Sequence, residues 1–223
     1  KEIFKEEKMK KKFKLFATIG SLALAICMMT IGVLAANNVS LSVTSTVTFG
    51  ATSTYVDFTG TVSGGDLDAA KTITVKNYET TDAASKDTFT GTGEGFSSNT
   101  WAIGKINFVE ESTKSGGQVI TYVFTIENPL AEGGAGLKVV ITPTIPKDIK
   151  QDTTGSSTSD VADYTVSYQT KDGEAQAVAG QATALNNIAG GDSVIVTYTL
   201  TLNNVAASLT GGTVSFDFDF SRV

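Results

Sequence analysis

Hydrophobic and polar positions alternate with a period of two in one segment of the chain after another. The first such segment is "AANNVSLSVTSTVTFG", residues 35–50, in which Ser or Thr fills the even positions from 40 to 48. Its apolar side chains stand at odd positions, and they are Val39, Leu41, Val43, Val47 and Phe49. This alternation predicts a β-strand with one apolar face.

The same pattern recurs along the rest of the chain, with turn residues between the segments. Further strands are predicted at 54–62, 71–77, 100–110, 118–128, 136–145, 192–204 and 212–220, and a hairpin at 163–178. Gly104 predicts a bulge, and Asp172-Gly173 predicts a type I′ turn in the hairpin. Residues 78–99 are expected to form a long loop with one short strand near Phe89, and residues 147–160 a solvated loop.

The composition supports the same fold class. Residues 37–223 contain 31 Thr and 18 Ser, and helix-forming runs are nearly absent from them. About ten strands without helices between them predict an all-β fold, an antiparallel β-sandwich of the jelly-roll or Ig-like type. We expect residues 37–223 to form a single sandwich domain. Its core is predicted to contain Tyr122, Phe124, Ile126, Val196, Tyr198, Leu200, Phe216 and Phe218.

A lysine-rich start and a long apolar run precede the first strand. Residues 9–14 read Met-Lys-Lys-Lys-Phe-Lys, residues 15–34 are mainly apolar, and small residues close the run. This arrangement predicts a signal peptide over residues 9–36, in the form of a hydrophobic helix, with cleavage after Ala35 or Ala36. The protein is therefore expected to be secreted or to lie at the cell surface.

Three further interpretations concern the same end of the chain. An apolar run of roughly 20 residues is long enough to span a bilayer, so an uncleaved membrane anchor is the alternative. The segment "LAIC", ending at Cys27, resembles a lipobox, but Ile26 is bulky where a small residue is required. Residues 1–8 precede Met9 and are interpreted as the product of an over-extended reading frame.

Charge and cysteine content exclude several classes of function. The chain has 17 Lys and Arg against 23 Asp and Glu, and seven of those Lys but only three of the Glu lie before Asn37. The exported part is therefore strongly acidic, and an acidic surface repels nucleic acid and anionic lipid. The single cysteine lies in the signal region, so no disulfide framework is expected.

The residue types that carry most enzyme chemistry are missing. The chain contains no histidine, which removes Ser-His-Asp and Cys-His catalysis and the histidine-bearing zinc sites. Paired carboxylates act on glycosides in some enzymes, and the candidates are Asp217 with Asp219, the Glu110-Glu111 pair and Asp57. Asp217 and Asp219 are expected to face solvent, because the alternating phenylalanines of their strand face the core. We expect no enzyme activity and no cofactor.

The residue types allow two binding functions, for calcium and for a glycan. Calcium needs only oxygen ligands, and the candidates are Asp66, Asp68, Asp148, Asp152, Asp160 and Asp163. No DxDxDG spacing occurs among them, so the identity of any metal ligand stays unknown. Aromatic rings that would stack on a glycan are Tyr55, Tyr78, Trp101, Tyr164 and Tyr168, although single aromatics in strands more often pack in a core.

One stretch of the sequence resembles a known group of proteins. The segment "KKKFKLFATIGSLALAICMMTIGVLAANNVSLSV", with its Gly32-Val33-Leu34-Ala35 end, is similar to the signal region of the TasA/camelysin group of exported bacterial proteins. The resemblance implies a jelly-roll subunit of an extracellular matrix fibre, in which an N-terminal strand completes the sheet of the next subunit. It also implies a metalloprotease activity, which a chain without histidine does not support.

The sequence therefore predicts a secreted, non-enzymatic structural subunit of a matrix fibre or cell-surface assembly. Residues 38–49 are expected to form an edge strand that is donated between subunits. Its five apolar side chains, Val39, Leu41, Val43, Val47 and Phe49, would be the plugs that fill the neighbour's core. We expect self-association through strand addition, no nucleic-acid partner, and membrane contact only through an uncleaved signal. The rival prediction is an adhesin or binding module whose partner is a glycan or a surface protein.

Overall fold

The computed structural model describes residues 42–49, 56–78, 90–92, 96–97, 100–110, 114–153, 161–174, 176–177, 183–203 and 212–223. The chain divides into two compact units, Lys1–Val39 and Ser40–Val223, and every described residue belongs to the second. All regular elements in this described part are β-strands. No helix among these residues has the length and apolar character needed to cross a membrane.

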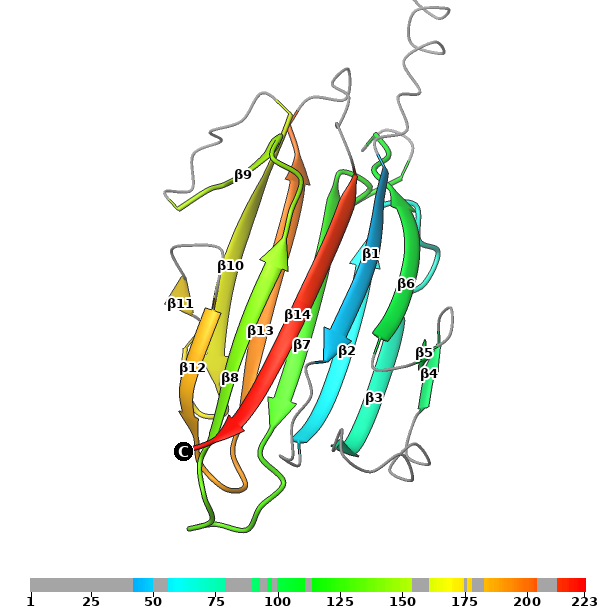
Figure 1. Cartoon of the computed structure of the whole chain (residues 1–223). Coiled ribbons are helices and arrows are strands. Elements are labelled where there is room, and N and C mark those ends of the chain that lie inside the picture. Colours follow the sequence, from blue (N-terminus) through cyan, green and yellow to red (C-terminus); the bar gives the residue numbers. More distant parts are fainter. Residues whose placement is uncertain are drawn as a thin grey trace, which may run out of the picture. The chain divides into compact units, whose positions relative to one another are not determined.

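The first of two sheets, here called sheet A, has six strands in the order β12-β8-β14-β1-β6-β5 (Figure 1). The strands are β1 (Ser42–Phe49), β5 (Phe96–Ser97), β6 (Thr100–Asn107), β8 (Leu137–Thr144), β12 (Thr183–Ile188) and β14 (Thr213–Arg222). All neighbours in this sheet are antiparallel except β1 and β14, which run parallel. The first and the last described strands are therefore adjacent.

The second sheet, sheet B, follows the order β11-β10-β13-β7-β2-β3-β4, and β9 pairs with β10 beside this path. The strands are β2 (Val56–Gly64), β3 (Lys71–Tyr78), β4 (Thr90–Thr92), β7 (Val119–Glu127), β9 (Ile149–Gln151), β10 (Ala162–Thr170), β11 (Gln176–Ala177) and β13 (Ser193–Leu202). Its main path is antiparallel throughout. The all-β antiparallel sandwich predicted from the alternation is confirmed.

The core lies between the inner faces of the two sheets. Phe124 of β7 packs edge-on against Phe216 and Phe218 of β14, with ring centroids 4.9 and 5.1 Å apart. Edge-on aromatic pairs at this separation are favourable beyond the area they bury. All eight residues predicted for the core are fully buried, which confirms the assignment of strand faces.

Gly104 in β6 makes the bulge that the sequence predicts. Its φ is +86°, and the register of β6 against β1 shifts between Ser45 and Thr46. Ser45 is paired with Gly104 and Thr46 with Ala102, so Ile103 is the extra residue. A glycine with positive φ is the usual way to accommodate such an extra residue without a steric clash.

The turn of the predicted hairpin differs from the expectation. The N–H of Gly173 donates to the carbonyl of Thr170 at 3.0 Å, so the turn is centred on Lys171 and Asp172. Gly173 does not have a positive φ, which a type I′ turn at Asp172-Gly173 requires. The type I′ assignment is therefore wrong, while the antiparallel pairing of β10 with β11 is present.

The two expected loops also contain short strands. In residues 78–99, β4 follows Phe89 directly, as predicted, and β5 is an addition. In residues 147–160, β9 pairs parallel with β10 through Ile149, which is 3% exposed. The prediction of a wholly solvated loop there is wrong, because one buried isoleucine is enough to hold a three-residue strand against the sandwich.

The buried amide of Asn128, just after β7, ties together several segments near one end of the sandwich. Its Nδ2 donates to the carbonyls of Ala135 and Ile188 at 3.0 and 2.9 Å. Its Oδ1 accepts from Nη1 of Arg222 at 2.8 Å and from the N–H of Leu130 at 3.3 Å. The amide therefore uses both donors and both acceptor positions, which is what burial of a polar group requires.

Candidate assembly site: the first strand and its slot

Strand β1 lies inside sheet A, between β14 and β6 (Figure 1). It runs parallel to β14, with Thr44 opposite Thr213 and Phe49 opposite Phe218, and antiparallel to β6. The prediction that this segment forms an edge strand is therefore wrong for the described residues. The absence of charge and proline from the segment suits a strand with neighbours on both sides, because every backbone N–H must then find a carbonyl.

The inner face of β1 carries three of the five predicted plugs. Val43 and Val47 are completely buried, and Phe49 is 2% exposed. The ring of Phe49 meets Phe58 of sheet B edge-on at 4.8 Å and lies 5.8 Å from Phe218 of its own sheet. These side chains join β1 to both layers of the sandwich. The other two plugs, Val39 and Leu41, lie outside the described residues, as do Ala35 and Ala36.

Ser45 is the one polar residue on this inner face, and it is completely buried. Its hydroxyl lies 2.6 Å from the hydroxyl of Tyr122, a buried residue of β7 in the opposite sheet. Burial raises the pKa of Tyr122 above its usual range, and the hydrogen bond with Ser45 opposes that rise. A neutral hydroxyl pair thus links the two sheets through the core. The sequence signal for it was present, since Ser45 alone interrupts the apolar positions between 43 and 49.

The outer face of β1 is polar and adjoins an acidic strand. Thr44 is exposed, and Thr46 and Thr48 are half-buried. Asp217 and Asp219 of β14 are exposed on the same side, as their alternation with phenylalanine predicts. One face of β1 thus contacts the core, the other faces solvent, and both backbone edges are hydrogen-bonded. Removing such a strand would leave a slot between β14 and β6 with two unpaired edges and an apolar floor.

The candidate catalytic carboxylates do not converge. Asp57 accepts a hydrogen bond from Nζ of Lys76 at 2.8 Å, an ion pair at the surface of sheet B. That hydrogen bond raises the pKa of Lys76. Asp217 and Asp219 lie on the outer face of sheet A, and Glu111 lies outside the described residues. Glu127 lies opposite Asp57 in the β2–β7 ladder, and Asp217 and Asp219 stand two residues apart on the exposed face of β14, so these carboxylates lie on the outer faces of two different sheets.

The aspartates considered for calcium are held in separate places. Asp66 accepts hydrogen bonds from the backbone N–H and the Nδ2 of Asn107, and its own N–H donates to the carbonyl of that residue. Asp163 is buried and accepts from Nδ2 of Asn203 at 2.7 Å. Asp160 lies outside the described residues. Within the residues that are described, no three Asp, Glu, Cys or His side chains gather as metal ligands would.

The aromatic rings considered for glycan stacking are mostly inside the protein. Trp101 and Tyr164 are buried, and Tyr168 is partly buried and donates to Oε1 of Gln176 at 2.7 Å. The side chains of Tyr55 and Tyr78 lie outside the described ones. Among the aromatic side chains that the structure describes, none is fully exposed for a sugar to stack on.

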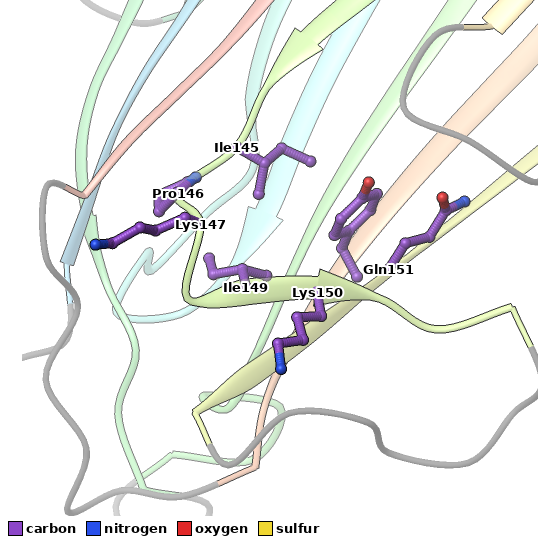
Figure 2. Close-up of a pocket in the computed structure, with 7 residues that line it drawn as sticks. Ile145, Pro146, Lys147, Ile149, Lys150 and Gln151 are labelled. Atoms are coloured by element: carbon purple, nitrogen blue, oxygen red, sulfur yellow. The ribbon is translucent and has the colours of Figure 1, made fainter.

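A pocket of about 420 Å³ opens beside β9 (Figure 2). It is lined by Ile145, Pro146, Lys147, Ile149, Lys150, Gln151 and Tyr164. Figure 2 shows the side chains of Lys147 and Lys150 extending in different directions, so they do not aim two positive charges at one ligand. The pocket mixes apolar and cationic walls without a converging set of polar groups.

Comparison with known proteins adds little to this picture. No protein-family model matches the chain, and a search of curated proteins gave no significant match. Among solved structures, the chain aligns with a mutant of the major pilin from Streptococcus pyogenes at 13% identity, over 82% of this chain and 98% of the pilin, with a TM-score of 0.17. A similarity this low supports no conclusion about fold or function. The TasA/camelysin resemblance thus rests on the signal-region residues and the general β-strand pattern of the sequence.

Proposed function

We propose that this chain is a structural subunit of an extracellular fibre or cell-surface assembly, in which β1 is exchanged between subunits. One observation supports this most directly. The first described strand is inserted at the centre of sheet A, between two strands that lie far away in the sequence. The slot it fills has the apolar floor and the two open edges that strand addition requires.

The energetics of the strand permit exchange. The contacts that hold β1 are all non-covalent: the buried side chains of Val43, Val47 and Phe49, and the ladder hydrogen bonds with β14 and β6. A strand from a neighbour would make the same contacts, so effective concentration decides between the two sources.

The remaining parts of the proposal follow from the sequence. The signal segment 9–36 directs export, cleavage after Ala35 or Ala36 frees the sandwich, and the mature domain acts outside the cell without enzyme activity. The residue composition supports the last point, since the chain has no histidine and its one cysteine lies in the signal segment. The acidic sandwich is expected to repel nucleic acid, so its partners are other copies of the chain.

The second candidate, a binding module, is favoured by the pocket beside β9. Glycan or protein capture there would need no exchange of β1. Binding by a chain that stays monomeric, lost when Lys150 is replaced by Ala, would support this candidate over the assembly.

The test of strand exchange uses paired cysteines in residues 37–223, which contain no natural cysteine. Thr48 lies opposite Asp217 in the parallel ladder. Chains with Thr48→Cys are mixed with chains with Asp217→Cys under assembly conditions and then oxidised. Exchange predicts disulfide-linked dimers, whereas the double variant in one chain tests the intramolecular pairing. Thr48→Cys mixed with Lys138→Cys is the matched control, since β8 does not neighbour β1.

Electron microscopy of the same proteins completes the test. Deleting residues 37–50 should abolish assembly, and a peptide of that sequence should cap the truncated subunit. A peptide with Val43, Val47 and Phe49 replaced by Ser should not cap it. If the truncated protein assembles as before, or if only intramolecular disulfides form in fibres, strand exchange is wrong.

A further inference from the structure

We infer that the four central strands of sheet A, β8-β14-β1-β6, form a mechanical clamp that resists tension along the chain. The load enters at the N-terminal end of β1 and leaves at the C-terminal end of β14. These two strands are adjacent and parallel, with six residue pairs from Thr44 opposite Thr213 to Phe49 opposite Phe218. Figure 1 shows their arrowheads pointing the same way, side by side.

The direction of the strands sets how this load acts on the ladder. Because β1 and β14 are parallel, the start of one and the end of the other lie at opposite ends of the pair (Figure 1). Pulling them apart slides the strands lengthwise past each other. Ladder hydrogen bonds lie across the strands, so all of them are strained together. An antiparallel hairpin pulled at its open end loses its hydrogen bonds one pair at a time instead.

Neither loaded strand can peel from an edge. Strand β1 is also paired with β6 over Ser42–Thr48, and β14 is also paired with β8 over eight residue pairs from Ser215 to Arg222. At the start of the ladder, the N–H of Thr44 donates to the carbonyl of Gly212 at 2.6 Å. Releasing either strand therefore requires breaking the ladders on both of its sides.

Side chains resist the same sliding motion. Phe49 is packed among Phe58, Phe218 and the neighbouring core, and the Ser45 hydroxyl is bonded to Tyr122 of the opposite sheet. A slip of two residues would keep the apolar face inward, but it would bring a valine to Tyr122 in place of Ser45. The buried hydroxyl of Tyr122 would then lose its partner, which is costly.

The far end of β14 is anchored as well. Arg222 donates through Nη1 to Oδ1 of the buried Asn128, and the N–H of Val223 donates to the carbonyl of Gly136 at 3.0 Å. Tension applied at this end acts on these contacts before it acts on the β1–β14 ladder. The clamp is therefore held at its loaded end by a buried polar group rather than by solvent-exposed contacts alone.

This inference does not depend on strand exchange. If β1 is the chain's own strand, the clamp protects the folded monomer. If β1 comes from a neighbour, the same ladders carry tension from one subunit to the next. Pulling on monomers tests the clamp alone, so a failure of the clamp and a failure of the proposed assembly are separate results.

The test is single-molecule pulling on residues 37–223 in two directions. In the first, handles are attached at the two ends, which loads β1 against β14. In the second, handles are attached to cysteines that replace Lys171 and Ser193. These two residues are joined by a backbone hydrogen bond of 3.0 Å at one end of the β10–β13 ladder. We expect the end-to-end unfolding force to be several-fold higher at the same loading rate. Equal forces in the two directions would overturn the inference.

Two variants locate the resistance. Ser45→Ala should lower the end-to-end force more than the force between positions 171 and 193, because only the first direction slides β1 across Tyr122. Thr46→Ala, on the polar face of the same strand, is the matched control and should leave both forces unchanged. An equal loss in both directions for Ser45→Ala would contradict the role of this side chain. Circular dichroism confirms that each variant is folded before it is pulled.

Discussion

The hydroxyl pair between Ser45 and Tyr122 gives the sharpest test of how β1 is held in its sheet. The two oxygens lie 2.6 Å apart, and both residues are completely buried. We predict that the two side chains are coupled energetically, so that the single variants Ser45→Ala and Tyr122→Phe together cost more than the double variant.

The expected magnitude follows from what each change leaves behind. Ser45→Ala leaves the Tyr122 hydroxyl buried without its partner, at a cost of about 1–3 kcal/mol. Tyr122→Phe leaves the smaller Ser45 hydroxyl, and serine hydroxyls commonly bond to local backbone groups, so its cost is about 0.5–1.5 kcal/mol. The double variant removes both polar groups, and such a replacement is close to neutral apart from the small cavities it leaves. The coupling free energy should therefore be about 1–2 kcal/mol.

Urea unfolding of residues 37–223 measures all four proteins of the cycle, and an unchanged slope with denaturant shows that they remain comparable. Thr46→Ala serves as the control, because its side chain lies on the polar face of the same strand, and it should change stability by no more than about 0.5 kcal/mol. A coupling free energy below about 0.5 kcal/mol would be within the range of independent sites. The hydrogen bond would then contribute nothing to holding β1, and the reasoning would be refuted.

Three further predictions concern the core, the pH dependence and the buried amide. Phe218→Ala should destabilise the protein by about 3–5 kcal/mol in urea unfolding, while Asp217→Ala next to it should have an effect near zero. A loss of stability below about 1 kcal/mol for Phe218→Ala would mean that the face assignment is wrong. Burial raises the pKa of Tyr122 in the folded protein, so the tyrosine of the unfolded chain loses its proton first as the pH rises. The free energy of unfolding should therefore fall above about pH 10. Tyr122→Phe should flatten that fall, and an identical pH profile for the variant would contradict the prediction. Asn128→Ala should cost about 2–4 kcal/mol, because it leaves buried carbonyls without their donor, and a loss no larger than that of an exposed asparagine such as Asn186→Ala would contradict this role.

The arrangement of faces was predictable because the alternation is strict. Val214, Phe216, Phe218 and Phe220 share one face of β14 in the sequence, and all are buried in the structure. The bulge at Gly104 was predictable for the same reason, since a lone glycine interrupts an otherwise regular strand. Local patterns of this kind depend only on neighbouring residues, which the sequence displays directly.

The position of β1 was not predictable in this way. An uncharged strand without proline satisfies the requirements of a donated strand and of a central strand equally well, and the choice depends on partners far away in the chain. Trp101 illustrates the same limit. As a single aromatic it was a candidate for sugar stacking, but it lies over Gly60 of the opposite sheet, where a Cβ atom would come within 2.8 Å of its ring. Local periodicity does not indicate long-range pairings of this kind.

The adjacency of β1 and β14 also sets the order in which the protein can fold. Strand β14 lies between β8 and β1, so a chain that ends before Thr213 leaves sheet A in two separate pieces, β12-β8 and β1-β6-β5. Strand β1 can pair with β6 early, but its pairing with β14 joins residues 44–49 to residues 213–218, a very high sequence separation that slows folding. Until β14 is in place, sheet A stays incomplete, and the facing edges of β8 and β1 remain unpaired.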